Sequence, residues 1–363
     1  MKLVDEFRDP DAVRTLAAQI RSAAEGAGRL CFMEVCGGHT MAIHRFGLPD
    51  LLPENIELRS GPGCPVCVTP STYVDRAIET GREPGTVLCT FGDLYRVPGE
   101  SASLEDAAAE GVDVRIVYSP RDALKVARNT PDSEVVFLAV GFETTAPTVA
   151  ATVLEAAADE VGNFRVLSGH KTMPRALRAL MEAPDVRLDG FLLPGHVAAI
   201  AGPDDYRFLP EEFDVACCVT GFEPMDILLG VLSLVRQVVE EAPRVDNQYK
   251  RAVADDGNPV AREVVSRVFE PADSQWRGLG LIPESGLDVR AEWGAFSRQG
   301  PDPAVPSSEN EACRCTEVLR GQVLPVECPL FGKACVPDSP VGPCMVSSEG
   351  ACAAFFRYGG ADV

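Results

Sequence analysis

The sequence predicts an α/β protein with two Rossmann-like parallel-sheet α/β domains and a loop-rich C-terminal iron–sulfur domain. Two observations predict the first part: apolar runs of strand length alternate with helical segments, and most of these runs end in a glycine beside a polar side chain. Strand–helix alternation is typical of βαβ units and a mostly parallel sheet. The third observation is that six of the thirteen cysteines follow residue 312, among prolines. Such a segment is expected to fold around bound metal rather than around an apolar core.

The strands and helices follow in chain order from the apolar pattern. The expected strands are short apolar runs at 29–35, 86–91, 112–117, 134–140, 164–167, 190–193 and 215–219. The expected helices are longer and carry apolar residues at helical spacing, at 11–25, 71–80, 147–161, 174–182, 225–241 and 260–269. Short runs bounded by turn residues fit strands, whereas longer periodic segments fit helices.

Three domains are expected, with the boundaries 1–122, 123–242 and 243–363. Gly-Phe-Glu occurs at 141–143 and 221–223, and Gly-His at 169–170 and 195–196, which suggests two related α/β halves. After the second domain, prolines, glycines and charges become more frequent. The segment 300–310 is expected to be a linker or an exposed loop.

Ionisable side chains lie at the ends of several expected strands, next to glycine. They are Cys36, His39, Glu143, His170, His196 and Glu223. Ligands bind at the carboxyl ends of strands in open α/β sheets, so these side chains predict a shared cleft. Lys171, beside His170, is expected to neutralise an anionic ligand. The alternative for Glu143, His170, His196 and Glu223 is that each is a core group with its hydrogen bonds satisfied. His44 has no comparable context and is expected to be structural.

The composition excludes several classes of protein. The formal net charge of −21 repels phosphate backbones, so nucleic-acid binding is not expected. The chain has no apolar stretch long enough for a membrane-spanning helix and no apolar signal core in residues 1–8, so a cytoplasmic protein is expected. Cytoplasmic thiols stay reduced and thirteen is an odd number, which favours metal, cluster or redox use over a disulfide framework.

The C-terminal cysteines predict a [4Fe–4S] cluster. Four widely spaced thiolates are available in the pattern Cys313-x14-Cys328-x6-Cys335-x16-Cys352, with Cys315 and Cys344 as alternates. Four thiolates hold such a cluster, and their spacing varies between families. A zinc site is the alternative, although zinc more often uses two close pairs and this segment has only Cys313-x-Cys315.

Two motifs near the N-terminus carry the remaining turn cysteines. Cys64-Pro65-Val66-Cys67 has the spacing of a redox-active dithiol, the alternative being half of a zinc site. Cys36-Gly37-Gly38-His39 offers a soft thiolate and an imidazole, which suit low-spin iron; the alternative is a free cysteine with His39 capping a helix. The other cysteines lie in apolar runs and are expected to be small buried hydrophobes: Cys31, Cys89, Cys217 and Cys218.

Together these motifs resemble the HypD family of [NiFe]-hydrogenase maturation factors. The resembling stretches are CGGHT at 36–40, GPGCPVC at 61–67, TFGD at 90–93, GFETTAP at 141–147, PGH at 194–196, GFEP at 221–224, NQY at 247–249 and FGKAC…CMVSSEGAC in the tail. The resemblance implies a scaffold on which the Fe(CN)₂CO moiety is assembled, with the iron at Cys36 and His39. It also implies that Cys64 and Cys67 are the redox pair and that the tail cysteines hold a [4Fe–4S] cluster. The one local departure is Arg175, where a second proline is expected.

The resemblance also implies partners. The iron would be held between Cys36 and the N-terminal cysteine of the small chaperone HypC, HypE would deliver cyanide, and the hydrogenase large subunit would receive the product. This function is that of an assembly scaffold rather than an enzyme acting on a free substrate. The alternatives are a ferredoxin-dependent thiol–disulfide oxidoreductase and a zinc-stabilised interaction module. The sequence contains no P-loop motif to support ATP chemistry.

Overall fold

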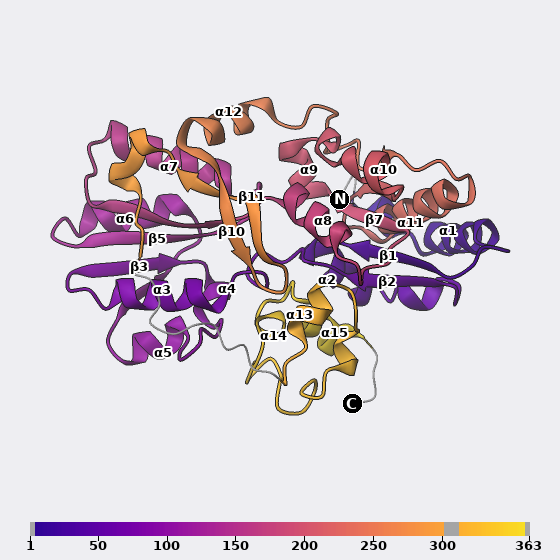
Figure 1. Cartoon of the computed structure of the whole chain (residues 1–363), viewed down its shortest axis with the longest axis horizontal. Helices are drawn as coiled ribbons and strands as arrows, with labels where there is room; N and C mark the ends of the chain where they lie inside the picture. Colours follow the sequence, from indigo (N-terminus) through magenta and orange to yellow (C-terminus); the bar gives the residue numbers. More distant parts are fainter. Residues whose placement is uncertain (1–3, 301–311, 360–363) are drawn as a thin grey trace.

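The structure, a computed structural model, describes residues 4–300 and 312–359. It has two α/β lobes side by side, with the C-terminal cysteine-rich segment below and between them (Figure 1). Except for Gly300, the expected linker at 300–310 lies outside the described residues. No helix of the described chain is long and apolar enough to cross a lipid bilayer.

Lobe A contains a five-stranded parallel sheet in the order β2-β1-β7-β8-β9. Its strands are β1 Leu30–Glu34, β2 Ile56–Ser60, β7 Gly190–Pro194, β8 Ala216–Thr220 and β9 Val245–Asn247. Its helices are α1 Pro10–Ala23, α2 Gly37–Arg45, α9 Gly195–Ala201, α10 Phe208–Phe213 and α11 Pro224–Val239. Helix α1 packs against α11 over an apolar cluster that includes strands β1 and β8.

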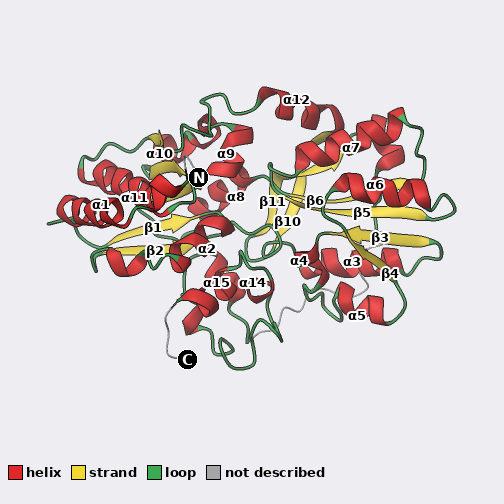
Figure 2. Cartoon of the chain, turned by 180° about the vertical axis from the view of Figure 1, so that it is seen from behind, coloured by secondary structure: helices red, strands yellow, loops and turns green. Residues whose placement is uncertain are grey.

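Lobe B contains a four-stranded parallel sheet in the order β4-β3-β5-β6. Its strands are β3 Thr86–Thr90, β4 Asp113–Ile116, β5 Glu134–Gly141 and β6 Phe164–His170. Its helices are α3 Ser71–Gly81, α4 Gly92–Tyr95, α5 Leu104–Ala109, α6 Pro120–Asn129 and α7 Ala146–Ala158. Helix α8 Met173–Glu182 follows β6 but lies beside α10 of lobe A, where Arg178 pairs with Glu212 at 2.6 Å. Seen from behind, helices cover the strands of both lobes (Figure 2).

Further elements connect the lobes. Helix α12 Pro259–Val268 contacts α7 of lobe B and α9 of lobe A. The antiparallel hairpin of β10 Phe269–Trp276 and β11 Gly280–Val289 lies against β6. The short 3₁₀ helices are η1 Asp5–Arg8, η2 Pro49–Leu51, η3 Pro203–Tyr206, η4 Ala291–Phe296 and η5 Pro325–Glu327.

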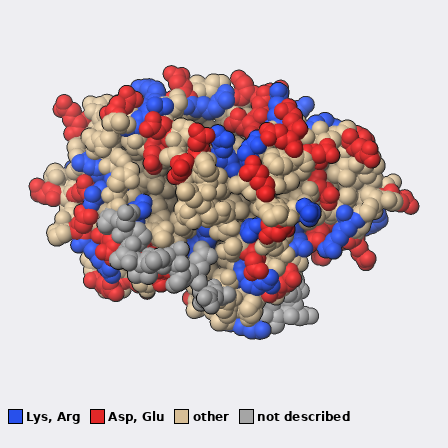
Figure 3. Space-filling view, in the orientation of Figure 1, with Lys and Arg blue, Asp and Glu red and all other residues tan. Residues whose placement is uncertain are grey.

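On the face drawn in Figure 3, acidic and basic side chains are mixed, so the charge of −21 is not gathered in one patch there.

The predicted α/β fold class is confirmed, because each expected strand and helix is present with small shifts of its ends. The central strands β3, β7 and β8 are buried along their whole length. A parallel strand covered by helices on both faces is expected to be a continuous apolar run, which is how these strands stand out in the sequence. Prolines stand at the first or second position of α1, α6, α7, α8, α11 and α12, where a missing N–H costs nothing.

The sheets do not follow the predicted boundary at residue 122. Strands β3 and β4, which precede it, share a sheet with β5 and β6, which follow it. Strands β7 and β8 then return to pair beside β1 in lobe A. The apolar pattern located the strands but did not show which strands pair, because all of them are similar apolar runs.

The boundary at 243 also lies within lobe A, since β9 pairs with β8. The cysteine-rich unit of the described chain begins at residue 312 and contains α13 Cys315–Leu319, α14 Pro343–Val346 and α15 Ala351–Tyr358. It contacts both lobes: Arg59 of lobe A donates to the Gly321 carbonyl at 3.2 Å, and Ser347 donates to Asp93 of lobe B at 2.6 Å. The unit therefore sits across the two lobes.

His44 links this unit to lobe A, and its burial predicts how the stability of the protein depends on pH. Its ring packs against Phe355 of α15, with the ring centroids 4.5 Å apart, and burial lowers the pKa of His44 to about 4. Between about pH 6.5 and 4 the unfolded chain binds a proton that native His44 does not, so the free energy of unfolding falls as the pH falls.

Between pH 8 and pH 4 we expect the free energy of unfolding of His44→Leu to fall by about 1–2 kcal/mol less than that of the wild type, because the variant has no imidazole to protonate on unfolding. The effect is limited to this size because the side chain is only partly buried. Urea unfolding at several pH values measures it, and the pH 8 value, where His44 is neutral in both states, serves as the internal reference. Parallel curves for the two proteins would contradict the prediction.

Candidate functional site

The three groups of turn cysteines meet where the two lobes and the C-terminal unit come together. This junction consists of the loops 35–40, 61–69 and 343–350. The first two loops touch through Gly63, and the second and third through the sulfur of Cys67, which lies 3.9 Å from the Pro343 carbonyl oxygen. The dithiol loop therefore lies beside the segment that carries Cys344.

Cys36 stands at the end of β1 and is the N-cap of α2. Two glycines follow it in the first turn of the helix, and both have close neighbours: a Cβ on Gly37 would lie 2.4 Å from Cβ of Glu349. Burial, and then the charge of Glu349, raise the pKa of the Cys36 thiol to about 12, although the N–H groups of Gly38 and His39 oppose the shift. Cys36 is thus a protonated thiol at neutral pH, and a metal would have to displace its proton.

Glu34, which the sequence analysis did not single out, supports this turn from below. It is buried at the end of β1, where its Oε2 accepts from the Cys36 N–H at 3.1 Å and its Oε1 accepts from the Thr40 hydroxyl. Burial raises the pKa of Glu34 to about 8, while hydrogen bonds from Thr40, Ser60 and Cys36 oppose that shift. The sequence did offer a sign of this role, since Glu34 is a carboxyl in an otherwise apolar strand and stands two residues before Cys36.

His39 lies in the same turn and is buried with one defined tautomer. Its Nε2 is 2.9 Å from the Gly221 carbonyl oxygen and 2.9 Å from the Thr220 hydroxyl. A carbonyl only accepts, so Nε2 carries the proton and Nδ1 is left with its lone pair. Nδ1 has no hydrogen-bond partner in the described chain, and burial lowers the pKa of His39 to about 4. The ring is therefore a neutral donor of a nitrogen lone pair.

A pocket of about 360 Å³ opens beside this turn. Phe222 stacks between His39 and His196, with ring centroids 4.7 and 4.0 Å away. Gly38, His196, Phe222 and Glu223 belong to the wall, together with Arg8, Arg45, Asp226, Tyr249, Arg251 and Glu349. Two predicted cleft residues, His196 and Glu223, are thus brought beside Cys36 and His39. Glu223 also begins α11 and pairs with Arg8 at 2.8 Å.

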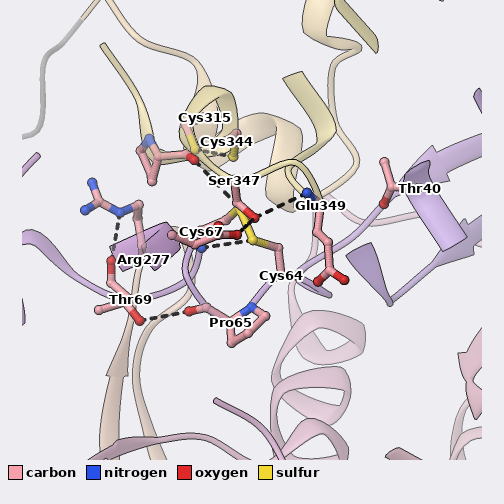
Figure 4. Close-up of a disulfide and its surroundings, with 12 residues drawn as sticks. Thr40, Cys64, Pro65, Cys67, Thr69, Arg277, Cys315, Cys344, Ser347 and Glu349 are labelled. Atoms are coloured by element: carbon pink, nitrogen blue, oxygen red, sulfur yellow. Dashed lines mark hydrogen bonds between the residues drawn. A yellow bond between two sulfur atoms is a disulfide. The ribbon is translucent and has the colours of Figure 1, made fainter. Parts of the chain in front are cut away.

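Cys64 and Cys67 form a disulfide in the loop before α3, with their Cα atoms 5.2 Å apart. Both are buried, at 4 and 0 % exposure. Figure 4 shows the disulfide between the loop of Pro65 and Thr69 and the side chains of Ser347 and Glu349 from the C-terminal unit. The disulfide therefore lies between the dithiol loop and the C-terminal unit.

The six C-terminal cysteines surround one small space. That space, of about 10 Å³, is lined by all six, with Val318, Phe331, Gly342 and Met345. The sulfurs of Cys315 and Cys344 are 2.6 Å apart, closer than those of unbonded cysteines normally lie. Cys335 accepts from the Val341 N–H at 3.3 Å, a contact that suits a thiolate.

The donor set of this unit fits a [4Fe–4S] cluster in kind. Six thiols with apolar neighbours match the ligands that such clusters use. No three Cys, His, Asp or Glu side chains of the described residues stand around one metal-ion position. Four thiolates of a cluster bind four different irons, so they do not need that arrangement. The space is smaller than a cluster, so the thiols would have to move apart to hold one.

Two of the predicted cleft residues lie elsewhere, in lobe B. Glu143 accepts from the N–H of Met173 at 2.8 Å and so holds the start of α8. His170 is buried against Phe269, with the ring centroids 5.3 Å apart. Both follow strands of the second sheet, whereas Cys36, His196 and Glu223 follow strands of the first. Neither Glu143 nor His170 is among the residues that line the pocket beside the Cys36 turn.

Comparison with known proteins gives a consistent result. Residues 11–359 match the family model HypD, described as the hydrogenase formation hypA family. The chain is 47 % identical over 368 residues to the hydrogenase maturation factor HypD of Azotobacter vinelandii, covering 99 % of this chain and 97 % of that protein. It is 46 % identical over 366 residues to HypD of Escherichia coli K12, covering 99 % of this chain and 98 % of that protein.

Gly63 gives a test of the junction. A Cβ at this position would lie 2.1 Å from the backbone nitrogen of Cys36, a contact that neither backbone can relieve locally. We expect Gly63→Ala to lower the free energy of unfolding by about 2–3 kcal/mol, because two loops must separate. Urea unfolding followed by circular dichroism measures it. Gly28→Ala, with no atom within 4 Å of the new Cβ, is the matched control, and equal midpoints for the two variants would refute the contact.

Proposed function

We propose that this chain, which belongs to the HypD family of hydrogenase maturation factors, is a scaffold for assembly of the Fe(CN)₂CO moiety of [NiFe]-hydrogenases. The observation that carries the proposal is the contact between three cysteine groups that are far apart in the sequence. Gly63 of the dithiol loop lies on the backbone of Cys36, and Cys67 faces Pro343, which precedes Cys344. These contacts support neighbouring sites for iron ligation and electron supply.

Cys36 and His39 are the proposed protein ligands of the iron under assembly. A thiolate suits iron that carries cyanide and CO, since such iron is low-spin and soft. The high pKa of Cys36 means that iron binding releases a proton, and the neighbouring Glu34 carboxyl is already hydrogen-bonded to this turn. The pocket beside Gly38 supports docking of a HypC-type chaperone that supplies a second cysteine. HypE is the proposed source of cyanide, and the hydrogenase large subunit receives the product.

Cys64 and Cys67 are the proposed electron carriers for ligand attachment. Reduction of their disulfide consumes two electrons and two protons and gives two thiols. Cys313, Cys328, Cys335 and Cys352 are the proposed ligands of a [4Fe–4S] cluster, which when bound supplies single electrons. Cys315 and Cys344, which line the same space, are the alternates.

The alternative is a thiol–disulfide oxidoreductase that reduces disulfides of other proteins. The Cys64–Cys67 disulfide favours dithiol chemistry as such. Exchange with a protein disulfide, however, requires the attacking sulfur to be reached. Exposures of 4 and 0 % keep both sulfurs from a macromolecular substrate, which favours an internal acceptor at the neighbouring Cys36 site.

Infrared spectroscopy tests the iron assignment. The protein is purified without oxygen together with its HypC-type partner, and bands of iron-bound cyanide and CO are expected. Cys36→Ala should abolish these bands, because the iron loses its protein thiolate, whereas Cys31→Ala is the matched cysteine control. Bands that persist in Cys36→Ala would exclude Cys36 as the ligand.

Iron analysis tests the cluster ligands separately. Serine at position 313, 328, 335 or 352 should reduce the iron content from about four per chain to near zero. Cys315→Ser and Cys344→Ser should keep the iron and the visible absorption of the cluster. If the Cys315 or Cys344 variant loses its iron while one of the other four variants keeps it, the ligand set must be reassigned. One zinc per chain in the wild type would show that the site binds zinc rather than a cluster.

A further inference from the structure

A second polar pocket, of about 200 Å³, lies in lobe B and borders the junction only at Thr69. The first turn of α3, the end of β6 and the β10–β11 hairpin form its walls. The polar residues of these walls are Thr69, Thr72, Tyr73, Arg76, Ser168, His170, Lys171, Asp273, Ser274, Gln275, Asp288, Arg298 and Gln299. The proposed scaffold function uses none of these residues.

Lys171 is the unusual member of this pocket. It is 3 % exposed, and its Nζ donates to the Ser274 hydroxyl at 2.9 Å and to the Gln275 carbonyl at 2.6 Å. The ammonium also lies 5.2 Å from the ring centroid of Trp276. No carboxylate of the described residues pairs with it, and an ammonium has three donors, of which these contacts use two. A buried charge without a counter-charge is costly.

The other charges of the pocket are already compensated. Arg298 pairs with Glu83 and Glu134, which are outside the pocket, and Arg76 faces Asp288. Asp273 accepts the Glu284 N–H at 3.0 Å. Lys171 is therefore the charge of this pocket that lacks a partner, and burial lowers its pKa to about 7.

Two further features can each contribute an N–H donor to this pocket. Helix α3 spans 11 residues and begins at this pocket without a side-chain cap. The Tyr73 N–H donates to the Pro70 carbonyl at 3.1 Å, which leaves the N–H groups of Ser71 and Thr72 for an acceptor. His170 is 1 % exposed, and neither of its ring nitrogens has a hydrogen-bond partner in the described chain. Unpartnered buried polar groups are rare in proteins and call for a partner.

We propose that this pocket binds a small oxyanion of the carboxylate or phosphate class, with the Lys171 ammonium as its counter-charge. Hydroxyls of Thr72 and Ser274 and the first turn of α3 supply the remaining donors. The pocket reaches Thr69, two residues after Cys67, and the Arg277 N–H ties Val68 to the hairpin at 2.9 Å. A bound anion therefore lies against the segment that leaves the dithiol loop.

Isothermal titration calorimetry of the full chain tests the site, with inorganic phosphate and acetate as separate probes in an anion-poor buffer. We expect one of them, or both, to bind once per chain, and the pattern distinguishes a phosphate site from a carboxylate site. Lys171→Met should weaken binding about tenfold or more, because a charge-assisted hydrogen bond is lost. Lys125→Met, at an exposed lysine on α6 that pairs with Asp122, should leave binding unchanged.

Two results would overturn the proposal: no heat with either probe, or equal binding by the wild type and Lys171→Met. The methionine keeps the stem but leaves the Gln275 carbonyl without its donor, so its urea midpoint is expected to be somewhat lower than that of the wild type. If that variant does not fold, Lys171→Gln, which keeps an N–H donor without the charge, replaces it and should weaken binding severalfold. These variants leave all cysteines in place, so the outcome is independent of the iron chemistry.

Discussion

The close contact between Gly63 and the backbone of Cys36 is the constraint on which the rest of the site depends. The Gly37 N–H donates to the Gly63 carbonyl at 3.1 Å, and the Gly61 N–H donates to the Glu34 carbonyl at 2.8 Å, so the dithiol loop extends the edge of β1 beyond its last residue. Only a residue without a side chain permits this distance. One loop therefore carries the disulfide on one side and supports the Cys36 turn on the other.

The ionisable side chains of the junction are buried. Cys36, His39 and Glu34 are all uncharged or easily neutralised in the free protein, because burial opposes charge on each of them. A site that is neutral when empty can accept a metal and release protons as it does so. Cys64 and Cys67 are buried as well, which limits the access of other proteins to their sulfurs.

The C-terminal unit shows how a small loop-rich segment is held in place. Its helices are short, and it is held by packing of α15 on α2 and by hydrogen bonds such as those of Ser347 with Asp93 and of Arg59 with the Gly321 carbonyl. Glu349 of this unit lies over Gly37, so the unit also forms part of the wall beside Cys36. The cysteine-rich segment thus has two roles in the proposed function, as a ligand set and as a wall of the iron site.

The sequence by itself determined the strands, the helices and the groups of cysteines, because apolar periodicity and turn motifs are local. It also indicated the chemistry, since thiol spacing is readable without a fold. Tertiary structure alone decided the pairing that joins β7 and β8 to β1, and therefore which strand ends share a cleft. For that reason His196 and Glu223 join Cys36, whereas Glu143 and His170 do not. Glu34 and Lys171 gain their importance only from burial, and burial depends on neighbours that are distant in the chain.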